Sequence, residues 1–89
     1  MQKILIVEDE KKLARYLQLE LMHEGYDIRV ANDGRSAIEQ HEAWGSDLIL
    51  LDLMLPELSG IEVCRRIRQH DDVPIIMLTA KDDVSDKVM

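Results

Sequence analysis

Short runs of apolar residues alternate along the chain with longer stretches that carry apolar residues at helical spacing. The apolar runs are Ile4–Val7, Leu48–Leu51 and Pro74–Leu78, while Tyr26–Ala31 alternates between apolar and polar residues. A run without alternation is typical of a strand that is covered on both faces, as in parallel sheets. The pattern therefore predicts four strands separated by amphipathic helices.

The helical stretches have their own start and stop signals. Gly25 is expected to end the first helix, Asn32–Gly34 to open the second, and Ser59 to cap the third. Residues 82–89 are expected to begin a fourth helix. The apolar stripes are Leu13, Leu17 and Leu21 beside Tyr16 in the first helix, Ala37, Ile38 and His41 in the second, and Ile61, Cys64 and Ile67 in the third.

Successive strand-helix units predict an α/β fold with right-handed crossovers and helices on both faces of a doubly wound parallel sheet. We expect about four strands, three helices and the start of a fourth, in a single domain over residues 1–89. Ligands of such sheets bind beyond the carboxyl ends of the strands. The residues that follow each strand are therefore the first place to look for a site.

Composition narrows the class of protein. Hydrophobic residues make up 46% of the chain and charged residues 33%, which is typical of a globular domain. The formal net charge of −7 argues against nucleic-acid binding by this chain. No apolar run approaches the roughly 20 residues of a membrane span, and the start does not read as a signal peptide. The lone Cys64 excludes a disulfide scaffold, so we expect a reducing, cytoplasmic location. Cys64 itself is expected to pack.

Acidic and hydroxyl side chains follow three of the predicted strands. Glu8 and Asp9 follow the first, Asp52 follows the third, and Thr79 follows the fourth. If these strands are neighbours, the side chains converge on one rim, where clustered carboxylates would repel one another. Magnesium would relieve that repulsion, and a carboxylate beside it can act as a nucleophile toward an activated phosphoryl group. Thr79 could donate a hydrogen bond to a phosphoryl oxygen.

Each of these residues also has an ordinary structural reading. Asp52 alone would be a solvated carboxylate, Glu8–Glu10 a helix start, and Thr79 the end of a strand. No glycine-rich phosphate loop is present. The other polar and sulfur-bearing residues are expected to be surface histidines at His23, His41 and His70, a solvated basic helix face at Arg65, Arg66 and Arg68, and packed methionines at Met54 and Met77.

Three motifs together resemble the receiver domain of two-component response regulators. They are Ile4–Glu10, Leu50–Pro56 followed by Gly60, and Pro74–Ala80. Their order and spacing are highly specific, and the likeness covers essentially the whole chain. The chain is most similar to receivers that precede a winged-helix DNA-binding domain, particularly those of Gram-positive bacteria.

The resemblance implies a flavodoxin-like strand order and a phosphorylation switch. It implies that a sensor histidine kinase donates a phosphoryl group to Asp52, in a transfer that the receiver itself catalyses without being a classical enzyme. It implies that Mg²⁺ is held by Asp9, Asp52 and the backbone carbonyl of Met54, with Glu8 acting through water. Thr79 matches the hydroxyl residue that turns toward the phosphoryl group and drives the switch.

The resemblance stops before the family's fifth strand, which carries a lysine and an aromatic switch residue. Lys81 does not match that lysine. We therefore expect the N-terminal part of one receiver, which holds Mg²⁺ but phosphorylates poorly, with DNA reached only through a domain outside this chain. An uncovered edge at Ile75–Leu78 would then favour self-association.

Two alternatives remain open. The first is an interaction module that no longer takes up a phosphoryl group, against which the intact acids and Thr79 argue. The second is a Mg²⁺-dependent phosphohydrolase with an aspartyl nucleophile. Such an enzyme needs an acid two residues after the nucleophile, where this chain has Met54.

Overall fold

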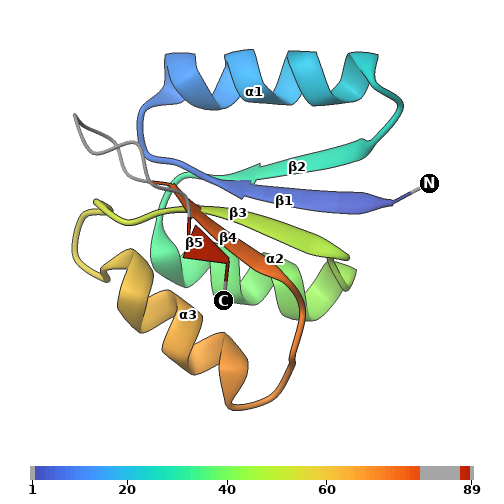
Figure 1. Cartoon of the computed structure of the whole chain (residues 1–89). Coiled ribbons are helices and arrows are strands. Elements are labelled where there is room, and N and C mark those ends of the chain that lie inside the picture. The colour runs from blue at the N-terminus through green and yellow to red at the C-terminus, as the bar shows by residue number, and fades with distance from the viewer. Residues whose placement is uncertain (1, 79–86, 89) are drawn as a thin grey trace.

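One sheet organises the computed structural model, which describes residues 2–78 and 87–88 (Figure 1). The strand order is β2-β1-β3-β4-β5, and the first four strands are mutually parallel. This order makes β1, β3 and β4 neighbours and confirms the flavodoxin-like prediction. The elements are β1 (Lys3–Val7), α1 (Lys11–His23), β2 (Asp27–Ala31), α2 (Gly34–Trp44), β3 (Leu48–Asp52), α3 (Gly60–Arg68), β4 (Ile75–Leu78) and β5 (Lys87–Val88).

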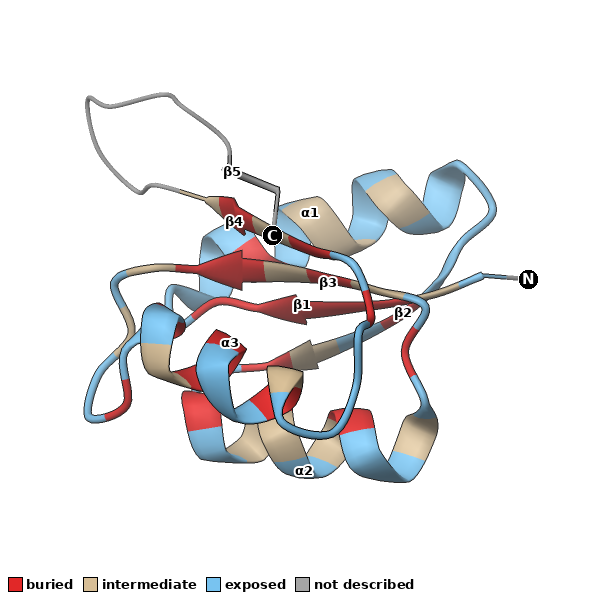
Figure 2. Ribbon diagram, turned by 60° about the horizontal axis from the view of Figure 1, so that its bottom comes forward, coloured by how far each residue is buried: buried red, intermediate tan, exposed pale blue. Residues whose placement is uncertain are grey.

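Helices cover both faces of the sheet. Helix α1 lies on one face, and α2 and α3 lie side by side on the other (Figures 1 and 2). Successive residues of a strand point to opposite faces, so Leu5 and Val7 join the α2/α3 core while Ile4 and Ile6 join the core under α1. Helices cover both faces of β1 and β3, which explains why these strands lack polar residues in alternation, whereas β2 at the edge of the sheet alternates.

Local signals set the helix ends as the sequence predicted. The side chain of Asp33 accepts a hydrogen bond from the Ser36 amide at 2.8 Å, and the Ser59 hydroxyl accepts one from the Glu62 amide at 3.2 Å. Gly25 follows α1 with a φ of 97°, which favours glycine. In the described residues, no helix combines the length and apolar character needed to cross a bilayer.

The C-terminal strand is a departure from prediction. Lys87 and Val88 pair antiparallel with Met77 and Ile76, so the expected helix over 82–89 is wrong at these two positions. The other residues of that segment lie outside the described ones. Pairing satisfies backbone groups that β4 would otherwise leave bare, and the predicted open edge is therefore wrong at Ile76 and Met77.

The structure corrects the prediction for one histidine, His41. His23 and His70 are exposed as expected, but His41 is only 5% exposed. It follows Ala37 by one helical turn, so it shares the face of α2 that packs against the sheet. Its Nε2 atom lies 2.7 Å from a carboxylate oxygen of Asp71, which satisfies one buried ring nitrogen.

The sulfur-bearing and long apolar side chains divide between core and surface. Cys64 and Met77 are buried, as expected. Met54 is 60% exposed, so its predicted packing role is wrong; it lies in the loop between β3 and α3. Leu13 and Tyr16 of α1 are also exposed, and only the apolar residues nearer the sheet in that helix pack against it.

Candidate metal centre

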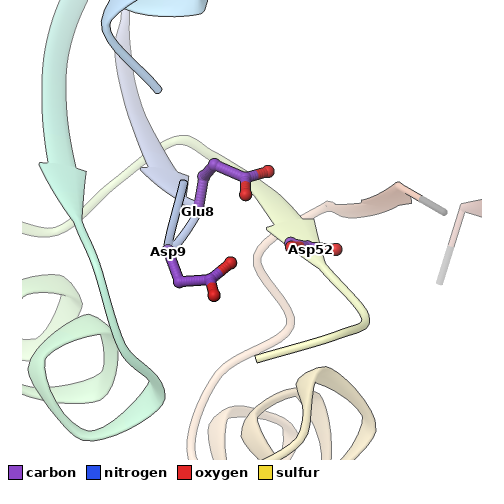
Figure 3. A group of neighbouring side chains, drawn as sticks. All are labelled: Glu8, Asp9 and Asp52. Carbon is purple, nitrogen blue, oxygen red and sulfur yellow. The ribbon is translucent and has the colours of Figure 1, made fainter. Parts of the chain in front are cut away.

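Three carboxylates converge at the carboxyl edge of the sheet (Figure 3). Glu8 and Asp9 directly follow β1, and Asp52 is the last residue of β3. One carboxylate oxygen from each lies within 4.8 Å of the others. Glu8 and Asp52 are 5% and 2% exposed, whereas Asp9 is exposed. The structure thus brings these three predicted residues together, while Thr79 lies outside the described residues.

Strand pairing and side-chain hydrogen bonds fix the position of Glu8. Its amide donates to the carbonyl of Ala31 at 3.0 Å, which extends the pairing of β1 with β2. The Asn32 side chain donates to the Glu8 carbonyl at 2.9 Å, and the Glu10 amide donates to the Glu8 carboxylate at 3.1 Å. The sequence marked Asn32 only as a turn residue, and nothing in the pattern indicated this contact.

The loop after β3 holds Asp52 in place. The Met54 amide donates to Oδ1 of Asp52 at 3.1 Å, which orients the carboxylate. The Leu53 amide donates to the Leu78 carbonyl, and the Gly60 amide to the Leu53 carbonyl, each at 3.1 Å. A Cβ atom at Gly60 would lie within 2.4 Å of the Asp52 carbonyl, so α3 can begin this close to β3 only with glycine.

The same loop carries a strained residue. Glu57 has a φ of 65°, in the left-handed region that residues other than glycine and asparagine rarely adopt. The Leu58 amide donates to the Pro56 carbonyl at 2.6 Å, so the turn closes tightly around Glu57. Such strain persists where surrounding contacts hold the loop, and it is often found at functional sites.

Burial and neighbouring acids shift the protonation of Glu8. Burial is the main cause that raises its pKa from 4.5 to about 7, and the charge of Asp52 adds to the rise. The hydrogen bond from the Glu10 amide opposes it. Near neutral pH, Glu8 is therefore partly protonated in the chain without metal. A bound cation would favour the ionised form of this group.

The donor set suits a hard divalent cation. All three side chains offer oxygen, and no histidine or cysteine belongs to the group. Oxygen ligands are those that Mg²⁺ prefers, usually one or two carboxylates with several waters retained. The exposed Asp9 leaves one side of the site open to solvent. The residues therefore fit Mg²⁺ better than a softer transition metal.

Comparison with known proteins identifies the family. The sequence profile of the response regulator receiver domain matches residues 4–89. The chain belongs to the response regulator receiver family. A curated member, the response regulator ArlR of Staphylococcus saprophyticus, is 56% identical over 88 residues, which are 99% of this chain and 40% of ArlR. The ArlR of Staphylococcus aureus strain Mu50 is 52% identical, and this chain again spans 40% of it.

Solved receivers have the same fold. The response regulator TrrA of Thermotoga maritima in complex with Mg²⁺ and BeF aligns with a TM-score of 0.86 and 40% identity, over 92% of this chain and 72% of TrrA. TrrA has also been solved in complex with the histidine kinase ThkA, and it aligns there with a TM-score of 0.86 and 39% identity, over 93% and 72% of the two chains. The chain thus shares the fold of these solved receivers.

Proposed function

We propose that Asp52 accepts a phosphoryl group from the phosphohistidine of a sensor histidine kinase, and that its phosphorylation state is the signal. The observation that carries this proposal is the position of Asp52, buried at the end of β3 and within 4.8 Å of the Glu8 and Asp9 carboxylates. TrrA, solved both with Mg²⁺–BeF and with a histidine kinase, supports the same role by similarity.

Magnesium is the cofactor that we propose for this site. Asp9, Asp52 and the backbone carbonyl of Met54 would hold the ion directly, and Glu8 would act through a bound water. When bound, Mg²⁺ would neutralise the charge on the oxygens of the phosphoryl group during transfer. The chain supplies the position of each oxygen, through the pairing of β1 with β3 and the hydrogen bonds that fix both strand ends.

The chemistry needs one nucleophilic oxygen. The Met54 amide binds Oδ1 of Asp52, so Oδ2 is the oxygen that we assign to the attack. The new O–P bond forms as the P–N bond to the kinase histidine breaks, and the imidazole nitrogen keeps the electron pair. Thr79 would then donate a hydrogen bond to a phosphoryl oxygen. The chain acts on itself, so we do not assign it a separate enzymatic activity.

The wider context is also a proposal. We infer that residues 1–89 are the N-terminal part of one receiver in a longer cytoplasmic regulator of transcription, in which another domain binds DNA. Family membership, and a chain that spans 40% of ArlR, support this inference. The net charge of −7 supports the view that this part of the protein does not bind nucleic acid itself.

Beryllofluoride, which mimics an aspartyl phosphate, tests the assignment of Asp52. With Mg²⁺ present, we expect fluorine NMR to show a bound signal with the native chain and with the control Asp27→Asn, which changes an exposed carboxylate at the other edge of the sheet. Asp52→Asn should abolish it. A native chain that folds yet gives no bound signal would favour the interaction module instead.

A further inference from the structure

A cavity lies between the C-terminal ends of α2 and α3, at the edge of the sheet opposite the acids. Both helices start at the carboxyl edge and run back to the start of the next strand, so their ends lie far from Asp52. The cavity has a volume of about 240 Å³, and Ile38 and Ile67 form its apolar walls. This volume suits one ring or a short chain and is too small for a nucleotide.

Negative charge dominates the rest of the wall. Glu42 and Asp71 line the cavity together with one arginine, Arg66, whose guanidinium shares the Glu62 carboxylate with Arg65. The two acidic residues of the wall thus outnumber its one arginine. Two helices also end here, and the carbonyl ends of helices carry partial negative charge. A cation would therefore be favoured over an anion of similar size.

The hydrogen-bonding groups of the wall also favour a ligand that donates hydrogen bonds, as an ammonium group does. A carboxylate oxygen can only accept, so Nε2 of His41 donates to Asp71 across their 2.7 Å contact. In the neutral ring, Nδ1 is then an acceptor, and it is buried without a partner in the part of the chain that the structure describes. His70 adds a second imidazole to the wall. Nδ1 of His41 is thus a buried acceptor that lacks a donor among the described residues, and each carboxylate oxygen of Asp71, which already accepts one hydrogen bond from His41 or from the Val73 amide, can accept another.

We propose that this cavity is a second binding site, which takes a small primary amine in its ammonium form with one short apolar body. The ammonium group, with three donors and no acceptor, would lie between Glu42 and Asp71. The apolar body would pack between Ile38 and Ile67. Binding would bridge α2 and α3 without using the acidic residues at the other edge.

Three probes with the same ring but different charge test the proposal. Benzylamine, benzyl alcohol and benzoate are titrated into the isotope-labelled chain in saturating Mg²⁺, which keeps cations from the acidic edge, and backbone shifts are followed by NMR. We expect saturable shifts with benzylamine at the amides of Ile38, Gly45 and Asp71. Benzyl alcohol should bind roughly tenfold more weakly, because it lacks the charge, and benzoate should not bind.

Two matched variants locate the charge. Glu42→Gln should weaken benzylamine several-fold and leave benzyl alcohol unchanged. Glu39→Gln, which removes an exposed carboxylate of α2 outside the cavity lining, should change neither. Three results would overturn the proposal: benzoate binding as well as benzylamine, equal losses in the two variants, or shifts confined to residues outside the cavity or absent altogether.

Discussion

The carboxylate of Glu8 lies where an acid is poorly tolerated in the absence of a cation. It is buried beside Asp52, and its pKa rises from 4.5 to about 7 mainly because burial disfavours the charge. A raised pKa means that its contribution to stability is full below pH 4.5 and is lost as the pH rises through about 7. Ionisation of Glu8 at neutral pH therefore costs stability in the absence of a cation.

Glu8→Gln should therefore change how stability depends on pH. In chelator, the native chain should lose roughly 1–3 kcal/mol relative to Glu8→Gln between pH 4.5 and pH 8, because only the native chain must ionise this group. Urea unfolding at several pH values measures the difference. The control Glu39→Gln should track the native chain, and a constant gap between Glu8→Gln and the native chain would contradict the account.

Glu57 has a backbone conformation that lowers the stability of the chain. Its φ of 65° is available to glycine without a steric penalty, so Glu57→Gly should stabilise the chain by roughly 0.5–1 kcal/mol. Thermal unfolding measures this directly. The exposed Glu39→Gly, in the middle of α2, should instead destabilise by a similar amount. If both changes destabilise alike, the contacts of the Glu57 side chain outweigh the strain of its backbone, and the prediction is wrong.

At the scale of elements, α3 is placed by its approach to β3. Gly60→Ala should lower stability by roughly 1–3 kcal/mol, because its Cβ would meet the Asp52 carbonyl and Leu53 backbone. It should also weaken Mg²⁺ binding, since the Asp52 backbone must move. Gly34→Ala is the control: its Cβ would meet Val63 and Leu58, so stability should fall while Mg²⁺ affinity holds. Equal Mg²⁺ affinity in both variants would contradict the coupling.

The edge of the sheet gives a prediction about association. Strand β5 covers the backbone of Ile76 and Met77, so removal of residues 87–89 should expose that edge and promote self-association. Light scattering over a range of concentrations would show a larger species for the truncated chain than for the full one. Removal of Met89 alone should have no effect. A truncated chain that stays monomeric would show that the edge is protected in another way.

For the whole molecule, the sequence pattern predicted the features that depend on neighbouring residues or on the order of the strands. Four strands, three helices and their caps followed from runs, spacing and capping residues, and the acidic rim followed once β1 and β3 were taken as neighbours. The pattern failed where contacts join distant residues. The His41–Asp71 pair joins residues 30 positions apart, and no helical period reveals a buried partner of that kind. The pairing of β5 likewise depends on the exposed edge of β4 rather than on its own residues.

A titration with Mg²⁺ tests the central claim most directly, because the whole account depends on three acids that act as one cation site. Backbone NMR shifts of the native chain should saturate, with the largest changes at Glu8, Asp9, Asp52 and the following loop. Asp52→Asn should weaken the binding by at least roughly tenfold, since one of the ligating charges is lost, whereas Asp27→Asn should leave it unchanged. Saturable binding that persists in Asp52→Asn, or a folded native chain that shows no response, would contradict the account.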